Sequence, residues 1–178
     1  MPGVKSLEAQ QYYAHPRNAF WPIMAELFTV TWSSDYQQRV AQLQQLPVML
    51  WDVLKQCQRE GSLDSDIEAD NLEANAIAQL LNEQTSVRVI AFNGGAAETL
   101  FKRHVAKSIS NLSDFNLMRL PSTSPAHASM NLQQKLQAWR ELESYLKGIA
   151  TFRRKAFHCA EIVIEYAPAR IPLTKITF

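Results

Sequence analysis

The residues best suited to chemistry lie together in one short segment near the start of the chain. Residues 11–21 read QYYAHPRNAFW and place four aromatic rings, a histidine, an arginine and an asparagine around one proline. Aromatic rings offer faces for stacking, and an asparagine side chain offers both donors and an acceptor. The segment therefore suits a flat, polar, aromatic ligand. The alternative is a turn whose Tyr13, Phe20 and Trp21 fill the core, and the residue types leave both open.

A second candidate is the junction between a predicted strand and a predicted helix. The β-branched run 87–92 indicates a buried strand, Asn93-Gly94-Gly95 ends it, and the apolar residues of 97–105 follow at helical spacing. Ligands of open α/β sheets bind at the carboxyl ends of strands, where the next helix presents free amides. Paired glycines also allow close approach to the backbone. An ordinary tight connection is the alternative.

A third candidate is the loop 121–127, which follows a short predicted strand at 116–120. It contains two prolines, three hydroxyl residues and His127. Prolines stiffen a loop, and hydroxyls with exposed amides suit phosphate oxygens. A plain connection to the next helix would have a similar composition.

The remaining pattern indicates an α/β protein that positions these three segments. Helices are predicted where apolar residues recur at helical spacing, with capping boxes at Ser34/Gln37 and Asp70/Glu73, and a strand is predicted near 162–164. The predicted helices cover residues 23–30, 34–46, 48–57, 70–81 and 132–142.

Composition narrows the function classes. With 178 residues, 47% hydrophobic residues and a formal net charge of +1, the chain fits one globular domain without a strongly basic surface. Cys57 and Cys159 have no metal-ligand spacing and suit a reducing cytoplasm, and no apolar run is long enough to span a membrane. The carboxylates of 64–70 lack the spacing of a calcium loop.

Taken together, the motifs resemble the uracil-DNA glycosylase superfamily, and within it the hypoxanthine-DNA (DNA-deoxyinosine) glycosylases. The resemblance covers about residues 1–142, so we place a glycosylase domain at 1–147 and a C-terminal extension of unknown role at 148–178. The motifs that carry it, in the family's order, are MPGVKSLE (1–8), YYAHPRNAFW (12–21), REGSLD (59–64), AFNG (91–94) and LPSTSP (120–125).

The resemblance implies a three-layer α/β/α sandwich around a mostly parallel sheet. It also implies a monofunctional enzyme that flips a deaminated base out of DNA and hydrolyses its N-glycosidic bond in base excision repair. Hypoxanthine is the first expected base, with uracil and xanthine next. We expect DNA as the partner, no metal or other cofactor, no membrane, a monomer and a cytoplasmic location.

The resemblance also implies roles for single residues. The mismatch-specific branch has its asparagine where this chain has Met1, whereas the hypoxanthine branch uses the asparagine of the His-Pro-Arg-Asn segment, which is Asn18 here. We therefore expect Asn18 to be catalytic, with an Asx-turn as the alternative role. Three further residues are expected to bind the base, namely Tyr13, Phe20 and Asn93. Four are expected to bind DNA, namely His15, Ser122, Ser124 and His127.

The chain departs from the family pattern at its beginning. Relatives carry an apolar strand and a Gly-Ser before the Met-Pro-Gly, and this sequence starts at Met1. That strand would be central, so its loss would deprive its neighbours of backbone partners. We expect either that 162–166 takes its place or that the chain is an inactive, DNA-binding relative.

Overall fold

The computed structural model describes residues 4–56, 72–146 and 161–165. Four parallel strands form one sheet with the order β1-β6-β4-β5, and β2 and β3 form a separate antiparallel pair. The strands are β1 (Val48–Asp52), β2 (Leu54–Gln56), β3 (Glu73–Ala74), β4 (Val89–Asn93), β5 (Asn116–Leu120) and β6 (Glu161–Glu165).

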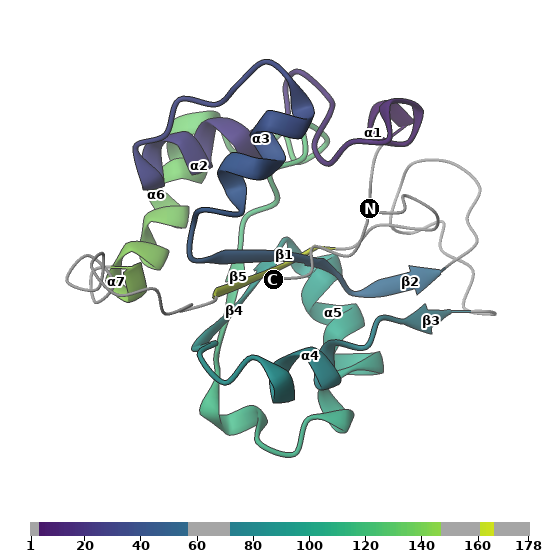
Figure 1. Ribbon diagram of the computed structural model, residues 1–178. Helices are drawn as coiled ribbons and strands as arrows, with labels where there is room; N and C mark the ends of the chain where they lie inside the picture. Colours follow the sequence, from purple (N-terminus) through teal and green to yellow (C-terminus); the bar gives the residue numbers. More distant parts are fainter. Residues whose placement is uncertain (1–3, 57–71, 147–160, 166–178) are drawn as a thin grey trace.

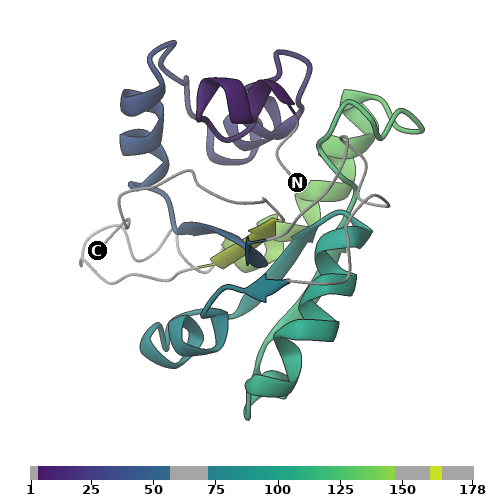
Figure 2. The same cartoon turned by 90° about the vertical axis from the view of Figure 1, so that its right-hand side faces the viewer.

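Helices cover both faces of the sheet, as Figures 1 and 2 show. Helices α2 (Phe20–Phe28), α3 (Tyr36–Leu43) and α6 (Leu132–Trp139) lie on one face, and α4 (Ile77–Glu83) and α5 (Gly95–His104) lie on the other. The short helices α1 (Val4–Ala9) and α7 (Glu143–Leu146) lie at the periphery. The expected α/β/α sandwich is confirmed.

The two cores follow from the alternation of side chains along the strands. In β4, Val89 and Ala91 pack with α2 and α6, whereas Ile90 and Phe92 pack with α4 and α5. All five β4 residues are buried, as expected for a strand covered on both faces. This burial fixes Asn93 at the sheet's carboxyl edge.

Strand β6 is the last of the described strands along the chain and yet lies inside the sheet. It is parallel to both neighbours: Val163 is paired with Leu50 of β1 and with Ala91 of β4. The strand expected near 162–164 is therefore confirmed, and it supplies the backbone partner that joins β1 to β4.

Several sequence-based boundaries were wrong. The segment 48–57 was expected to be a helix and instead forms β1 and β2, because a short apolar run cannot be assigned by periodicity alone. Val48 and Met49 enter opposite cores, as consecutive strand residues do.

The helix expected at 70–81 begins only at Ile77, because β3 occupies Glu73–Ala74. The N-cap of α3 is Asp35 rather than Ser34, and its carboxylate accepts a hydrogen bond from the backbone N–H of Gln38. The last long helix ends at Trp139, followed by a 3₁₀ turn (Arg140–Leu142) and α7.

Some expectations fall on residues outside the described ranges. These are the segment 1–3, the 59–64 motif, the carboxylates of 64–70, and both cysteines. Within the described ranges, no helix has the length and apolar character needed to cross a membrane.

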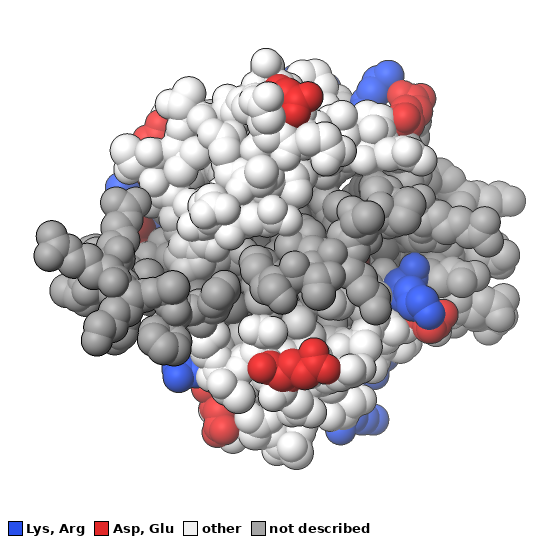
Figure 3. All heavy atoms as spheres, viewed as in Figure 1, with Lys and Arg blue, Asp and Glu red and all other residues white. Residues whose placement is uncertain are grey.

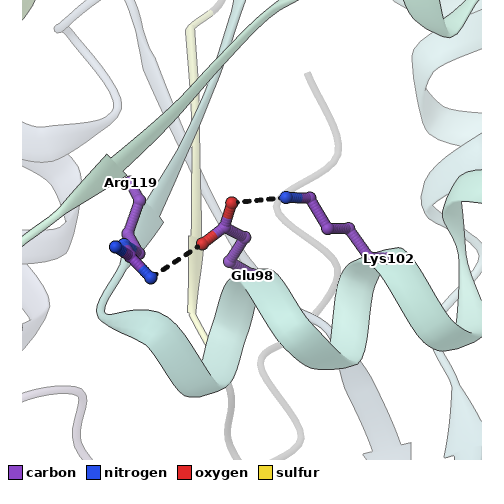
Figure 4. A network of polar contacts seen from close by, with 3 residues as sticks. All are labelled: Glu98, Lys102 and Arg119. Carbon is purple, nitrogen blue, oxygen red and sulfur yellow. Dashed lines mark hydrogen bonds and ion pairs between the residues drawn. The ribbon is translucent and has the colours of Figure 1, made fainter.

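The described residues form no large single-sign patch on the face shown in Figure 3, where Lys, Arg, Asp and Glu occur as separate small groups. One ion-pair network fastens α5 to the edge strand β5 (Figure 4). The Glu98 carboxylate lies 2.6 Å from Lys102 Nζ and 3.5 Å from an Arg119 guanidinium nitrogen. It therefore helps to hold the first turn of α5 beside the end of β5.

We predict that Val163→Pro destabilises the protein by about 3 kcal/mol or more, because an interior strand uses every backbone N–H in the ladder. The matched control is Leu117→Pro in edge strand β5. Asn116 N–H faces β4, so by alternation Leu117 N–H faces away from it. Urea denaturation of both variants measures the difference, and equal losses would contradict an interior position for β6.

Candidate functional site

The carboxyl ends of β4 and β5 lie side by side and bring two of the candidate segments together. The backbone N–H of Gly94 donates to the carbonyl of Leu120 at 3.0 Å. Gly94 has φ +101°, and a Cβ built on it would lie 3.0 Å from Ser122 Cβ. Only glycine fits this conformation and this close approach without strain. The Asn93-Gly94 pair thus seats the 121–125 loop against the end of β4.

The side-chain amide of Asn93 clasps that loop at Thr123. Asn93 Oδ1 accepts from the Thr123 backbone N–H at 2.8 Å, and Asn93 Nδ2 donates to Thr123 Oγ1 at 2.9 Å. Both residues are buried. The Thr123 carbonyl in turn accepts from the backbone N–H of Ala19 at 3.0 Å. All three segments that the sequence singled out therefore meet at Thr123.

Tyr13 and Phe20 form a stacked pair beside this junction. Their ring centroids are 3.8 Å apart with an interplanar angle of 16°, and Phe20 is fully buried. Asn93 Nδ2 also lies 3.3 Å from the Tyr13 hydroxyl oxygen, to which it donates. Tyr13 has φ +55°, which is unusual for a bulky residue. A flat ring with a polar edge thus already occupies one face of Phe20 and reaches Asn93.

Asn18 makes the turn that precedes α2. Its Oδ1 accepts from the backbone N–H of Phe20 at 3.0 Å, and its own backbone N–H donates to the His15 carbonyl at 2.8 Å. This is the Asx-turn contact that the sequence left as an alternative. A carbonyl oxygen has two lone pairs, so Oδ1 can accept a second hydrogen bond. The side chain is half-buried, and its Nδ2 has no hydrogen-bond partner among the described residues.

The candidate DNA-binding residues lie on two neighbouring loops. Ser122 Oγ accepts from the backbone N–H of Ser124, and Ser124 Oγ accepts from that of Ala126, each at 3.2 Å. His127 is in the same loop and donates its backbone N–H to the Ser124 carbonyl. His15 belongs to the 11–21 segment, where its Nδ1 accepts from Arg17 N–H. All four candidates are partly exposed.

A buried carboxyl at the end of β1 was not anticipated from the sequence. Asp52 Oδ2 accepts a short hydrogen bond from the Tyr12 hydroxyl, and the buried Oδ1 has no hydrogen-bond partner within the part of the chain that the structure describes. Burial raises the pKa of Asp52 from its ordinary 3.8 to about 7, although the hydrogen bond from Tyr12 lowers it.

Sequence reasoning also missed Thr123 and Lys135. Thr123 is fully buried, although it lies between the two serines that attracted attention. Lys135 is buried on α6 and donates to the Ser124 carbonyl at 2.9 Å. The sequence did contain one sign of the burial of Lys135, which is its position on the same helix face as the apolar residues Leu132, Leu136 and Trp139. No group of three metal-ligating side chains occurs within the described residues.

Comparison with known proteins gives one family and two relatives. The model of the family described as "Uracil DNA glycosylase superfamily" matches residues 1–143. A protein named hypoxanthine DNA glycosylase from Methanosarcina barkeri is 34% identical over 95 residues, which are 53% of this chain and 59% of that protein. A protein of the same name from Methanosarcina acetivorans is 34% identical over 98 residues, which are 54% of this chain and 61% of that protein. The chain thus spans about three fifths of the length of these curated relatives.

We predict that Asp52→Asn stabilises the protein in a pH-dependent way. Because the folded pKa lies above the unfolded one, the wild type is most stable below pH 4 with respect to this group and loses that stability as the pH rises through 7. Asparagine cannot ionise. The unfolding free energy of Asp52→Asn, relative to that of wild type, should therefore rise by about 2 to 4 kcal/mol between pH 4 and 8.

Urea denaturation at a series of pH values measures this difference. Tyr12→Phe is the paired variant, because it removes the hydrogen bond that lowers the Asp52 pKa and should extend the loss of stability to higher pH. A pH-independent difference between Asp52→Asn and wild type would contradict the raised pKa.

Proposed function

This chain belongs to the uracil-DNA glycosylase superfamily, and we propose that it is a DNA glycosylase that removes deaminated bases, hypoxanthine first. The observation that carries the proposal is the Tyr13 ring, stacked on Phe20 with its hydroxyl beside Asn93. A nucleobase is also a flat ring with polar edge groups. It can make the same two contacts if Tyr13 gives up its place.

The edge chemistry of Asn93 suits a deaminated base. Deamination leaves a carbonyl next to a ring N–H, which is an acceptor beside a donor. The Asn93 amide offers a donor and an acceptor in the complementary order. A base that displaces Tyr13 takes over the Nδ2 hydrogen bond that the Tyr13 hydroxyl now accepts, while both hydrogen bonds to Thr123 are kept. Hypoxanthine, uracil and xanthine all share this edge, and the names of the two relatives favour hypoxanthine.

The reaction needs the base outside the DNA stack, because the bond to be broken is not accessible within a duplex. Extrusion costs a few kcal/mol of unstacking and unpairing, which contacts to the base and the backbone must offset. Cleavage of the C–N glycosidic bond leaves a cationic sugar and an anionic base. Water then adds to the sugar, and the proton it releases neutralises the base. We assign Asn93 Nδ2 to the developing charge on the base, since a fixed donor there lowers the barrier.

We assign Asn18 to the attacking water. Its Oδ1 is held in place by the Phe20 N–H and can accept a hydrogen bond from a water through its second lone pair. A water held in this way presents its own lone pair to the sugar. The Asn18 N–H donates to the His15 carbonyl, so the residue assigned to water and a candidate phosphate contact belong to the same hydrogen-bonded turn.

One observation favours a second candidate, a DNA-binding relative without activity. Phe20 has no exposed surface, and Tyr13 covers the face that a base would need. If Tyr13 does not move, the protein can still contact DNA through Ser122, Ser124, His15 and His127 without cutting the glycosidic bond.

We predict that the chain cleaves the glycosidic bond of deoxyinosine in a duplex oligonucleotide, and that Asn18→Ala lowers the rate at least about 100-fold, the usual effect of removing a positioned polar group. Alkaline scission of abasic sites measures the reaction, with deoxyuridine and deoxyxanthosine duplexes as parallel substrates. Asn18→Ala should also lose about 1 kcal/mol of stability with its turn contact.

The matched control is Asn111→Ala, an exposed asparagine remote from the carboxyl ends of the strands. It should keep the wild-type rate. Binding of duplex DNA without scission, by a folded wild-type chain, would contradict the enzyme and favour the inactive relative.

A further inference from the structure

One helix holds both ends of the 121–125 loop from behind. Trp139 Nε1 donates to the Pro121 carbonyl, and Lys135 Nζ donates to the Ser124 carbonyl, each at 2.9 Å. The two residues are four apart on α6 and therefore lie on the same face of the helix. Trp139 is an uncharged anchor. Lys135 also binds a carbonyl of the loop, but it carries a full positive charge.

That charge is buried and has no acidic partner. Lys135 is only 4% exposed, and no carboxylate of the described residues lies within ion-pair distance of its Nζ. The exposed Lys5, Lys55 and Lys102 each pair with a glutamate. An ammonium taken out of water without a counter-charge is destabilising, and an apolar side chain of similar length would fill the space better. Packing alone therefore does not account for a lysine here.

The same loop also carries two hydroxyl groups that can donate hydrogen bonds. The hydroxyl oxygens of Ser122 and Ser124 accept from backbone amides of the loop itself. Each hydroxyl thus keeps its proton to donate to another group. Both residues are partly exposed. Two hydroxyl donors with a positive charge behind them form a surface suited to an anion with several acceptor oxygens.

We propose that Lys135 is a positioning residue for DNA phosphate: from beneath the 121–125 loop it fixes the loop's shape and supplies the charge that draws one backbone phosphate onto Ser122 and Ser124. This inference rests on the proposed function, because it takes DNA as the ligand. It adds a charged residue to a loop for which the sequence indicated only hydroxyls and a histidine.

The burial of Lys135 is consistent with a role in binding phosphate. Burial lowers the pKa of the Lys135 ammonium, which means that the free protein holds this charge against its solvation preference. A phosphate placed on the loop provides the opposite charge that the described residues lack. Binding of DNA is therefore favoured, because its phosphate gives the Lys135 ammonium an opposite charge that it lacks among the described residues of the free protein.

The test compares Lys135→Met with wild type in binding to an undamaged, fluorescein-labelled duplex at a series of KCl concentrations. Removing one phosphate interaction should weaken binding several-fold at low salt and reduce the slope of log K against log salt by about one. With deoxyinosine DNA, the KM should rise while kcat at saturation changes little. The melting temperature should not fall, because a buried unpaired charge has been removed.

The matched control is Lys107→Met, which removes the same charge from an exposed lysine beyond the far end of α5. It should keep the wild-type slope. If Lys135→Met fails to fold, Lys135→Gln takes its place, since a neutral amide can still donate a hydrogen bond.

An unchanged salt slope in a folded Lys135 variant would overturn the proposal, and a lowered melting temperature alongside it would assign Lys135 a packing role. An equal change in Lys107→Met would overturn it as well. The undamaged duplex separates this inference from the proposed function. A flattened slope without any base removal would refute the glycosylase alone, whereas base removal with an unchanged slope would refute only the role of Lys135.

Discussion

The two hydrogen bonds between the Asn93 amide and Thr123 are the interaction on which the candidate site depends. They join the end of a buried strand to a loop from the neighbouring strand, and Thr123 passes the connection to the start of α2 through its carbonyl. A buried amide that lost these partners would be left unsatisfied, which is destabilising. The clasp therefore both stabilises the fold and holds Asn93, Phe20 and Ser122 in one neighbourhood. It also means that a base can reach Asn93 only by replacing Thr123 or Tyr13.

The sheet that carries the clasp is completed by a strand from far along the chain. Strand β6 separates β1 from β4, so Asp52 and Asn93 stand at the same edge with one strand between them. Because a parallel interior strand is bonded on both sides, the C-terminal segment contributes directly to the geometry of the carboxyl edge. The same topology places the 121–125 loop beside Asn93, since β4 and β5 are direct neighbours. α6 then holds this loop from behind through Lys135 and Trp139.

Residue patterns predicted the parts of this arrangement that depend on local chemistry. The β-branched run before Asn93, the double glycine and the proline-bounded loop all carried recognisable signals, and the strand at 116–120 has the bounds expected for it. The prediction of a helix at 48–57 failed, because four apolar residues in a row fit a buried strand as well as a helix. The contacts of Thr123, Asp52 and Lys135 could not be predicted, because each depends on a partner distant in sequence. Nor could the sequence show that Tyr13 stacks on Phe20, since a bulky residue rarely adopts the left-handed backbone conformation that Tyr13 has here.

If the protein is the proposed glycosylase, the extruded base takes the place that the Tyr13 ring occupies now. The most direct measurement is a crystal structure of the protein with a duplex that contains 2′-fluoro-2′-deoxyinosine, whose glycosidic bond resists cleavage. We expect to find hypoxanthine stacked on Phe20 with its edge on the Asn93 amide, and the Tyr13 ring displaced from its present position. A bound duplex in which Tyr13 remains stacked on Phe20 and the hypoxanthine stays within the helix or elsewhere on the surface would contradict it.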